Sequence, residues 1–165
     1  PLILLMNLDE EQFISGKYYK KDEVMALVNQ RNIPIVEVCA KVELEISELD
    51  EEDRLIFMED LGIQIIGTGK LASAAYNLLG LISFLTVGED EVRAWTINNG
   101  INAKEAGGKI HSDISRGFIR AEVAKFSDFE TYGSMQKLKE KGLVRLEGKE
   151  AIIEDGDIIN FRFNV

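Results

Sequence analysis

The sequence predicts two folds in series, an α/β segment over residues 1–80 followed by a smaller α+β domain over residues 81–165. In the first half, apolar runs that are typical of buried parallel strands alternate with patterns of helical spacing. In the second half, short strand patterns surround one helical stretch, with glycine and asparagine turns between them. The pattern of apolar residues changes near Gly80, where we place the domain boundary.

The first half begins with the apolar run Pro1–Met6, which is typical of a strand that is covered on both faces. Residues 21–31 then carry apolar side chains at helical spacing. A second apolar run, Ile35–Cys39, follows Pro34. Strand, helix and strand in this order predict a parallel pair, and such a pair alone leaves backbone edges unpaired. We therefore expect residues 1–80 to depend on further strands for folding.

Two more helices are expected before the boundary. Asp50 is a suitable N-cap with Asp53 three residues later, and Gly62 is a suitable helix stop. Thr68 is expected to cap the next helix, which ends at Gly80.

The second half combines several strand patterns with few helical ones. The strand patterns cover residues 81–87, 91–97, 118–126, 144–147 and 157–164. The helical patterns lie near residues 103–110 and 134–141. A mixed sheet wrapped around one helix is the β-grasp arrangement, which is the predicted fold of this half. Its expected core residues are Phe84, Trp95, Ile97, Phe118, Ile152 and Phe161.

The chain carries a net charge of -10, of which -8 lies in residues 1–80 and -2 in residues 81–165. A strong sequence-independent grip on nucleic acid needs clustered Lys and Arg, so we expect no DNA binding. The second half is nearly neutral, which leaves RNA contact open there.

Cys39 is the only cysteine and His111 the only histidine, so neither an internal disulfide nor a Cys/His metal cluster can form. We expect no metal site, and no catalytic role for His111. The longest apolar stretch, residues 78–87, is too short to span a bilayer. These features are typical of a soluble cytoplasmic protein without a membrane partner.

The string Gly67-Thr-Gly-Lys70 resembles part of a Walker A loop, G-x-x-x-x-G-K-[ST], which holds phosphates with backbone N–H groups and a lysine. Aligned on the lysine, the first glycine position holds Gln64 and the hydroxyl position holds Leu71. We therefore predict a loop that leads into a helix, without a phosphate site.

Asn7-Leu-Asp-Glu10 follows directly on the first strand, where nucleotide-binding α/β proteins place residues that recognise the base. In the guanine-specific motif N-K-x-D, the Asp accepts two N–H bonds from guanine and the Lys stem covers the base. Here Glu10 stands in place of the Asp and Leu8 in place of the Lys. Adenine presents one amino donor beside a ring acceptor, so this substitution favours relaxed or ATP-leaning selectivity. The simpler interpretation is an ordinary turn capped by Asn7.

Cys39-Ala-Lys41 ends the second strand, where nucleotide-binding domains carry an S-A-K loop whose backbone N–H groups contact the base. A cysteine at the serine position keeps the size but donates a weaker hydrogen bond. Cys39 also fits the role of a small buried side chain, and the two interpretations are compatible.

Taken together, seven strings resemble the YchF (Obg-like) ATPase family, and they span essentially the whole chain. The strings are Asn7-Leu-Asp-Glu10, Cys39-Ala-Lys41, Leu79-Gly-Leu-Ile-Ser-Phe84, Glu91-Val-Arg-Ala-Trp-Thr96, Gly108-Lys-Ile-His-Ser-Asp113, Gly117-Phe-Ile-Arg-Ala-Glu122 and Asp155-Gly-Asp-Ile-Ile-Asn-Phe-Arg-Phe-Asn-Val165. The V-R-A-W-T string and the terminal F-R-F-N-V are not expected by chance.

The resemblance implies that residues 1–80 are the end of a P-loop nucleotide-binding domain and that residues 81–165 are a TGS domain of β-grasp fold. The intact protein would then bind ATP or GTP with Mg²⁺ and hydrolyse it, and its partner would be the ribosome, through ribosomal RNA or protein. Asn7, Leu8, Glu10, Cys39, Ala40 and Lys41 would contact the nucleotide base. Because the chain has no complete Walker A loop, we expect it alone to hold no catalytic residue and no cofactor.

The alternative is a free-standing β-grasp module that binds protein or RNA without any nucleotide role. In either case Lys104, Lys109, Arg116 and Arg120 cluster in sequence around the β-grasp helix and are candidates for phosphate or acidic-partner contact. Scattered solvated charges are the simpler interpretation. The acidic turn at residues 154–157 could hold a cation but is more typical of Asx turn chemistry.

Overall fold

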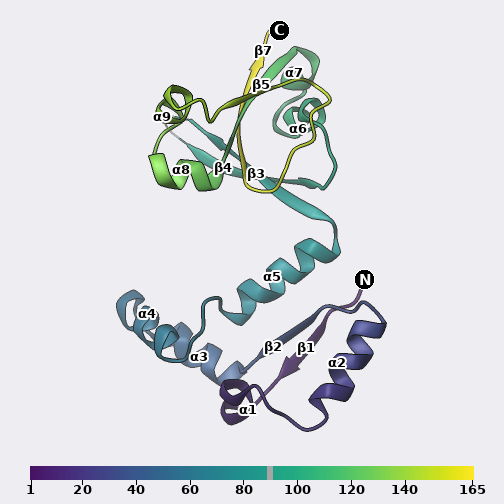
Figure 1. The fold of residues 1–165 in the computed structure, drawn as a ribbon, viewed down its shortest axis with the longest axis vertical. Helices are drawn as coiled ribbons and strands as arrows, with labels where there is room; N and C mark the ends of the chain where they lie inside the picture. Colours follow the sequence, from purple (N-terminus) through teal and green to yellow (C-terminus); the bar gives the residue numbers. More distant parts are fainter. Residues whose placement is uncertain (89–90) are drawn as a thin grey trace. The chain divides into compact units, whose positions relative to one another are not determined.

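The computed structural model describes residues 1–88 and 91–165, which divide into two compact units, Pro1–Leu79 and Gly80–Val165. Each unit has its own sheet (Figure 1). The units are described in turn.

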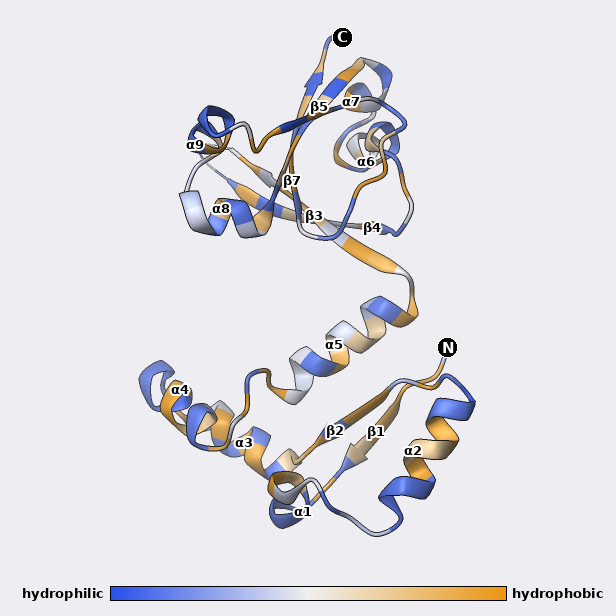
Figure 2. Cartoon of the chain, viewed as in Figure 1, coloured by the Kyte–Doolittle hydropathy of each residue, from blue (hydrophilic) through white to orange (hydrophobic). Residues whose placement is uncertain are grey.

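The first unit contains a two-stranded parallel sheet, as the sequence predicts. β1 (Leu4–Asn7) pairs with β2 (Ile35–Val38) so that Leu4 lies opposite Ile35 and Asn7 opposite Val38. Hydrophobic residues run along both strands (Figure 2). The parallel register brings the carboxyl ends of the two strands to the same level, and this places the loops that follow them side by side.

Five helices are described in the first unit. They are α1 (Glu10–Ser15), α2 (Lys21–Gln30), α3 (Ala40–Glu48), α4 (Glu51–Asp60) and α5 (Gly67–Leu78). Asp50 caps α4 as predicted, because its side chain accepts the Asp53 N–H at 3.0 Å. The prediction that Thr68 caps α5 is wrong, since α5 begins one residue earlier and Thr68 lies within it.

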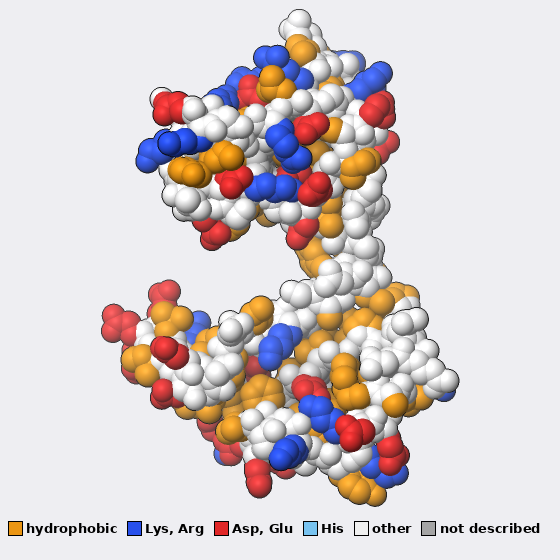
Figure 3. All heavy atoms as spheres, in the orientation of Figure 1, with side chains coloured by type: hydrophobic (Ala, Val, Ile, Leu, Met, Phe, Trp, Pro, Cys, Tyr) orange, Lys and Arg blue, Asp and Glu red, His pale blue; other side chains and the backbone are white. Residues whose placement is uncertain are grey.

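The first unit leaves much apolar surface exposed (Figure 3). Its buried cluster is small and consists of Cys39, Val42, Ile46 and Ile63. Leu5, in the middle of β1, is 49% exposed although it lies on a strand whose sequence is typical of a doubly covered sheet. This sheet has the composition of a larger sheet's interior and buries only part of its apolar surface.

The second unit holds a five-stranded mixed sheet in the order β4-β3-β7-β5-β6. Its strands are β3 (Leu81–Val87), β4 (Val92–Asn98), β5 (Phe118–Lys125), β6 (Arg145–Glu147) and β7 (Asp157–Phe163). Its helices are α6 (Ala103–Ile110), α7 (Ser112–Arg116), α8 (Phe126–Tyr132) and α9 (Met135–Glu140). The β3–β7 pair is parallel and the other pairs are antiparallel. The helix α8 was not expected, because its first residue continues the apolar pattern of β5.

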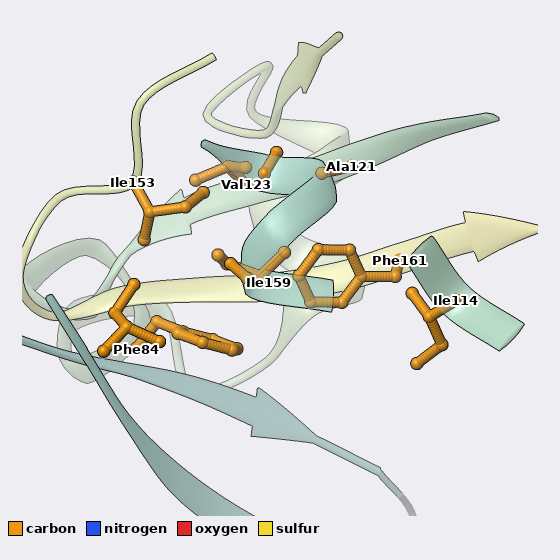
Figure 4. Close-up of a cluster of buried hydrophobic side chains, with 10 residues drawn as sticks. Phe84, Ile114, Ala121, Val123, Ile153, Ile159 and Phe161 are labelled. Carbon is orange, nitrogen blue, oxygen red and sulfur yellow. The ribbon is translucent and has the colours of Figure 1, made fainter. Parts of the chain in front are cut away.

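The core of the second unit lies between the sheet and α6, and two of its rings meet edge to face (Figure 4). Phe84 and Phe161 have centroids 6.0 Å apart. The predicted core residues Phe84, Ile97 and Phe161 are buried, while Trp95 and Phe118 pack against them half-buried.

The prediction that Ile152 belongs to the core is wrong, since it is 56% exposed and the neighbouring Ile153 is buried instead. The Ile153 N–H donates to the Ile101 carbonyl at 3.1 Å. Successive side chains of an extended segment point to opposite sides, so only one of two adjacent isoleucines can enter the core.

Two buried carboxylates of the second unit are neutralised by cations. Asp157, which is 1% exposed, accepts from Lys125 Nζ at 2.9 Å and from the Glu154 N–H at 2.9 Å. Glu122 accepts two bonds from Arg162, at 3.1 and 3.2 Å, and lies 2.8 Å from Lys139. The Glu122 contacts link β5, β7 and α9, and the contact of Asp157 with Lys125 links β5 to β7.

Hydrogen bonds from Arg162 and then from Lys139 lower the pKa of Glu122 below its usual value. A carboxylate with a lowered folded-state pKa contributes stability that is fully present above its unfolded pKa and is lost as the pH falls through the folded one.

We expect Glu122→Gln to destabilise the chain by about 2 kcal/mol at pH 7 and to flatten its loss of stability in acid. Denaturant unfolding at pH 7 and pH 3 measures both. The exposed Glu150→Gln is the control, and an unchanged acid slope for Glu122→Gln would contradict this role.

Residues 80–165 should fold alone, whereas residues 1–79 should not. The second unit has a core that is covered by a five-stranded sheet. The first unit has a two-stranded sheet whose apolar side chains are partly exposed to solvent. Separate expression of the two pieces and thermal melts test this expectation. A cooperative melt for residues 1–79, or none for residues 80–165, would contradict it.

Candidate nucleotide-base site

The loops after β1 and β2 are joined by backbone pairing at the strand ends. The Leu8 N–H donates to the Val38 carbonyl at 2.8 Å, which extends the parallel register by one residue beyond β1. As a result, Asn7-Leu-Asp-Glu10 and Cys39-Ala-Lys41 meet at the carboxyl edge of the sheet. Ligands of open α/β sheets bind at this edge.

Two side-chain contacts link the predicted motifs directly. The Ala40 N–H donates to Asn7 Oδ1 at 3.0 Å, and Lys41 Nζ donates to Glu10 Oε2 at 3.0 Å. Lys41 Nζ also lies 3.9 Å from Glu45 Oε1. Four of the six residues predicted for the base site are therefore joined in two pairs. The residues of the Asn7–Ala40 pair are 33 positions apart in sequence, and those of the Glu10–Lys41 pair are 31 positions apart.

Lys41 is held as a cation at this site. The hydrogen bond with Glu10, and then the negative charge of Glu10, raise the pKa of Lys41 above its usual value. The ammonium group is solvent-exposed, so the ion pair orients the Glu10 carboxylate more than it stabilises the fold.

The remaining two predicted residues, Leu8 and Cys39, are buried, with 7% and 1% of their surface exposed. Cys39 lies at the N-cap position of α3 and belongs to the buried cluster of the first unit. Both side chains are packed inside the first unit and support the two loops there, so little of either side chain is open to a ligand.

The turn after β1 is capped by Asp9, not by Asn7. Asp9 accepts the Gln12 N–H at 2.8 Å, and the Gln12 side chain accepts the Asp9 N–H at 3.2 Å. This reciprocal capping box fixes Glu10 as the first residue of α1. The D-x-x-Q spacing was the sequence signal for α1, and it leaves the Asn7 side chain to bind Ala40.

The exposed groups of this site present acceptors beside donors. The Glu10 carboxylate supplies the acceptors. The Lys41 ammonium group and the Lys41 N–H group, in the first turn of α3, supply donors because first-turn amides lack intrahelical acceptors. A planar group that carries a donor next to an acceptor matches this pattern.

Gly67-Thr-Gly-Lys70 opens α5, and a carboxylate of the protein already occupies its first amide. Glu43 Oε1 accepts the Gly67 N–H at 2.7 Å. This contact takes up a donor that a phosphate would need. The prediction of a loop over residues 67–70 is wrong, since these residues form the first turn of α5. The Glu43 contact also explains why Thr68 is not the cap, since the capping group comes from another helix.

The acidic residues of the turn at residues 154–157 are engaged in contacts within the protein. Asp155 Oδ1 accepts the Ser83 N–H at 2.7 Å, and Glu154 and Asp157 both bind Lys125. Across residues 1–88 and 91–165, no group of three His, Cys, Asp or Glu side chains is arranged to hold a metal ion. Over the same ranges, no helix is long and apolar enough to cross a membrane.

The four predicted partner residues lie on three elements, α6, α7 and β5. Lys104 and Lys109 lie five residues apart on α6, which separates them by about 140° around the helix. Lys104 lies beside Lys149, because its N–H donates to the Lys149 carbonyl at 3.2 Å. Arg116 ends α7 and binds Asp113 at 2.7 Å.

Arg120 has a different neighbour, since it lies opposite Arg162 in the β5–β7 pair. Residues directly opposite each other in an antiparallel pair project from the same face of the sheet.

His111, which was expected to have no catalytic role, caps α7 by accepting the Asp113 N–H at 3.2 Å.

Residues 81–164 match the family model YchF-GTPase_C, which is described as a protein of unknown function. The chain belongs to the YchF family. It is 45% identical over 169 residues to the ribosome-binding ATPase YchF of Bacillus subtilis, and 44% identical over 165 residues to the protein of that name from Escherichia coli O157:H7. Both alignments cover 100% of this chain and 45% of the relative, so the chain spans about half the length of these curated YchF proteins.

A solved YchF structure agrees with this assignment. The Schizosaccharomyces pombe YchF GTPase superposes with a TM-score of 0.82 at 28% identity, over 98% of this chain and 43% of that one. A GTP binding protein from Pyrococcus horikoshii OT3 superposes with a TM-score of 0.65 at 12% identity, over 97% of this chain and 45% of that one, and it supports the fold alone. The similarity includes residues 1–79, so the chain is the C-terminal region of a YchF-type protein and not a free-standing module.

Proposed function

We propose that this chain supplies the base-recognition site and the partner-binding domain of a ribosome-associated ATPase of the YchF type. The observation that carries the proposal is the pair of contacts that joins the two strand-end motifs, Ala40 with Asn7 and Lys41 with Glu10. In this proposal Leu8 and Cys39 support the site from the buried side.

Base selectivity follows from the hydrogen-bonding edge of the base. Adenine presents an amino donor beside a ring nitrogen acceptor, which pairs with the Glu10 carboxylate and with an N–H group of the Cys39-Ala-Lys41 loop. Guanine presents two neighbouring donors, which suit a carboxylate at the Asp position of N-K-x-D. In addition, Lys41 already engages one Glu10 oxygen, so the carboxylate has reduced capacity to accept two bonds from guanine.

We assign the first unit to the end of a P-loop nucleotide-binding domain and the second to a TGS domain of β-grasp fold. The parallel pair with its strand-end motifs supports the first assignment. The mixed sheet packed against α6 supports the second. ATP or GTP and Mg²⁺ would bind the intact protein in the cytoplasm, where Mg²⁺ would neutralise charge on the transferring phosphate.

We propose that the TGS domain contacts the ribosome. Relatives of this chain carry the name ribosome-binding ATPase, and the second unit presents the exposed cations Lys104, Lys109, Arg116 and Arg120. Lys104 and Lys109 lie on α6, whereas Arg116 and Arg120 lie on α7 and β5, so the two pairs can be tested separately.

Glu10→Asp in the full-length protein should shift selectivity toward GTP by about tenfold, or 1.4 kcal/mol. The shorter carboxylate restores the residue type that meets the two guanine donors, and it draws back from Lys41. Titration of ATP and GTP against mutant and wild type measures the ratio. Glu11→Asp, one residue further along α1, is the matched control. An unchanged ratio for Glu10→Asp would remove Glu10 from the base site.

Replacement of Lys104, Lys109, Arg116 and Arg120 by Glu in the full-length protein should weaken ribosome co-sedimentation and reduce its salt dependence. The melting temperature should change little, since these side chains are exposed. Charge reversal of Lys137 and Lys141, exposed cations at α9, is the control. Separate Lys104/Lys109 and Arg116/Arg120 variants show which face binds. Unchanged sedimentation of the folded fourfold variant would place the partner surface elsewhere.

A further inference from the structure

Glu43 forms a contact that neither strand-end motif includes. Its carboxylate accepts the Gly67 N–H at 2.7 Å, in a half-buried position, and so connects the first turn of α3 to the first residue of α5. The two residues are 24 positions apart in sequence. Glu43 lies two residues after Lys41, on the helix that begins with Ala40.

The contact suits both helices chemically. The residue before α5 is Ile66, whose hydrocarbon side chain cannot accept a hydrogen bond from the helix. A carboxylate at a helix N-terminus satisfies a first-turn N–H group and interacts favourably with the helix dipole. Glu43 provides this function from a neighbouring helix.

Glycine at position 67 permits the close approach. A Cβ added there would lie 2.6 Å from Val38 Cγ1 and 3.0 Å from Glu43 Oε1. Real Cβ atoms essentially never approach another atom to within 3.0 Å, so a larger residue would push α5 away from β2 and α3. The last residue of β2, the first turn of α3 and the start of α5 therefore pack as one unit.

The first turn of α3 has few other anchors on its exposed side. Val42 and Ile46 fix the buried side of the helix in the core cluster. On the exposed side, Ala40 is bound by Asn7, and Lys41 is bound through a solvent-exposed ion pair that water and salt weaken. Glu43 adds a half-buried anchor at Gly67, and this anchor constrains the rotation of the turn and the direction of the Lys41 N–H group.

We propose that Glu43 is a positioning residue for base recognition, which holds the amides of the Cys39-Ala-Lys41 loop in register with Glu10 by anchoring α3 to α5. This inference rests on the proposed base site and adds a residue to it that does not touch the nucleotide. It also links the base loop to α5, the helix that ends at Leu78, three residues before the start of β3 at Leu81.

The test uses the full-length protein and compares ATP with inorganic tripolyphosphate, which lacks the base. Glu43→Ala should weaken ATP binding about tenfold and leave tripolyphosphate binding unchanged. Glu43→Gln keeps an oxygen that accepts the Gly67 N–H, so it should bind ATP within about twofold of wild type. Glu48→Ala, an exposed carboxylate on the same helix, is the matched control.

Glu43→Asp covers the case in which Glu43→Ala fails to fold. Its carboxylate is one methylene shorter, so it should weaken ATP selectively but less than Glu43→Ala. Wild-type ATP affinity in a folded Glu43→Ala or Glu43→Asp protein would overturn the proposal. An equal loss of ATP and tripolyphosphate binding would also overturn it, because that result indicates general damage.

Asn7→Ala in the same assay separates this inference from the proposed function. If Asn7→Ala weakens ATP relative to tripolyphosphate and Glu43→Ala does not, the base site stands and the role of Glu43 fails. If neither substitution changes that ratio, the base site itself is wrong.

Discussion

The hydrogen bond from the Ala40 N–H to Asn7 Oδ1 is the contact on which the candidate site depends. It joins the residues that follow two neighbouring parallel strands, and it uses an amide at the start of a helix, where no intrahelical acceptor exists. The strand register brings the two loops to the same level, and the Asn7 side chain then fixes their separation. The ion pair of Lys41 with Glu10, and the contact of Glu43 with Gly67, act on loops that this bond has already brought together.

The two units satisfy their polar groups in different ways. In the second unit, the buried carboxylates Glu122 and Asp157 are matched by cations from neighbouring strands and from α9, next to a closed aromatic and aliphatic core. In the first unit, the polar contacts lie at loop and helix ends, and the sheet beneath them keeps much apolar surface exposed. The arrangement in the second unit is typical of a domain that folds alone, whereas that in the first unit is typical of one edge of a larger sheet.

A capping residue need not come from its own helix, and α5 shows the consequence. The string Gly67-Thr-Gly-Lys70 has only the Gly-Lys pair of a phosphate loop, and its first N–H is bound by a carboxylate from α3. A sequence search sees the glycines and cannot see the carboxylate, which lies 24 residues away. The glycine at position 67 serves helix packing against Val38, not phosphate approach.

The sequence by itself determined most elements, the position of Gly80 at the change of fold, and the two strand-end motifs. These features depend on local patterns, such as apolar runs, helical spacing and turn residues, which are legible along the chain. Helices α1, α3, α7 and α8 were not predicted; α1, α7 and α8 are at most seven residues long, and α3 follows directly on the apolar run of β2. The burial of Ile153 in place of Ile152 and the capping of α5 by Glu43 were decided only by the tertiary structure. Both depend on which distant backbone lies alongside, since adjacent isoleucines are equivalent in a pattern and a carboxylate acquires its partner only when two helices meet.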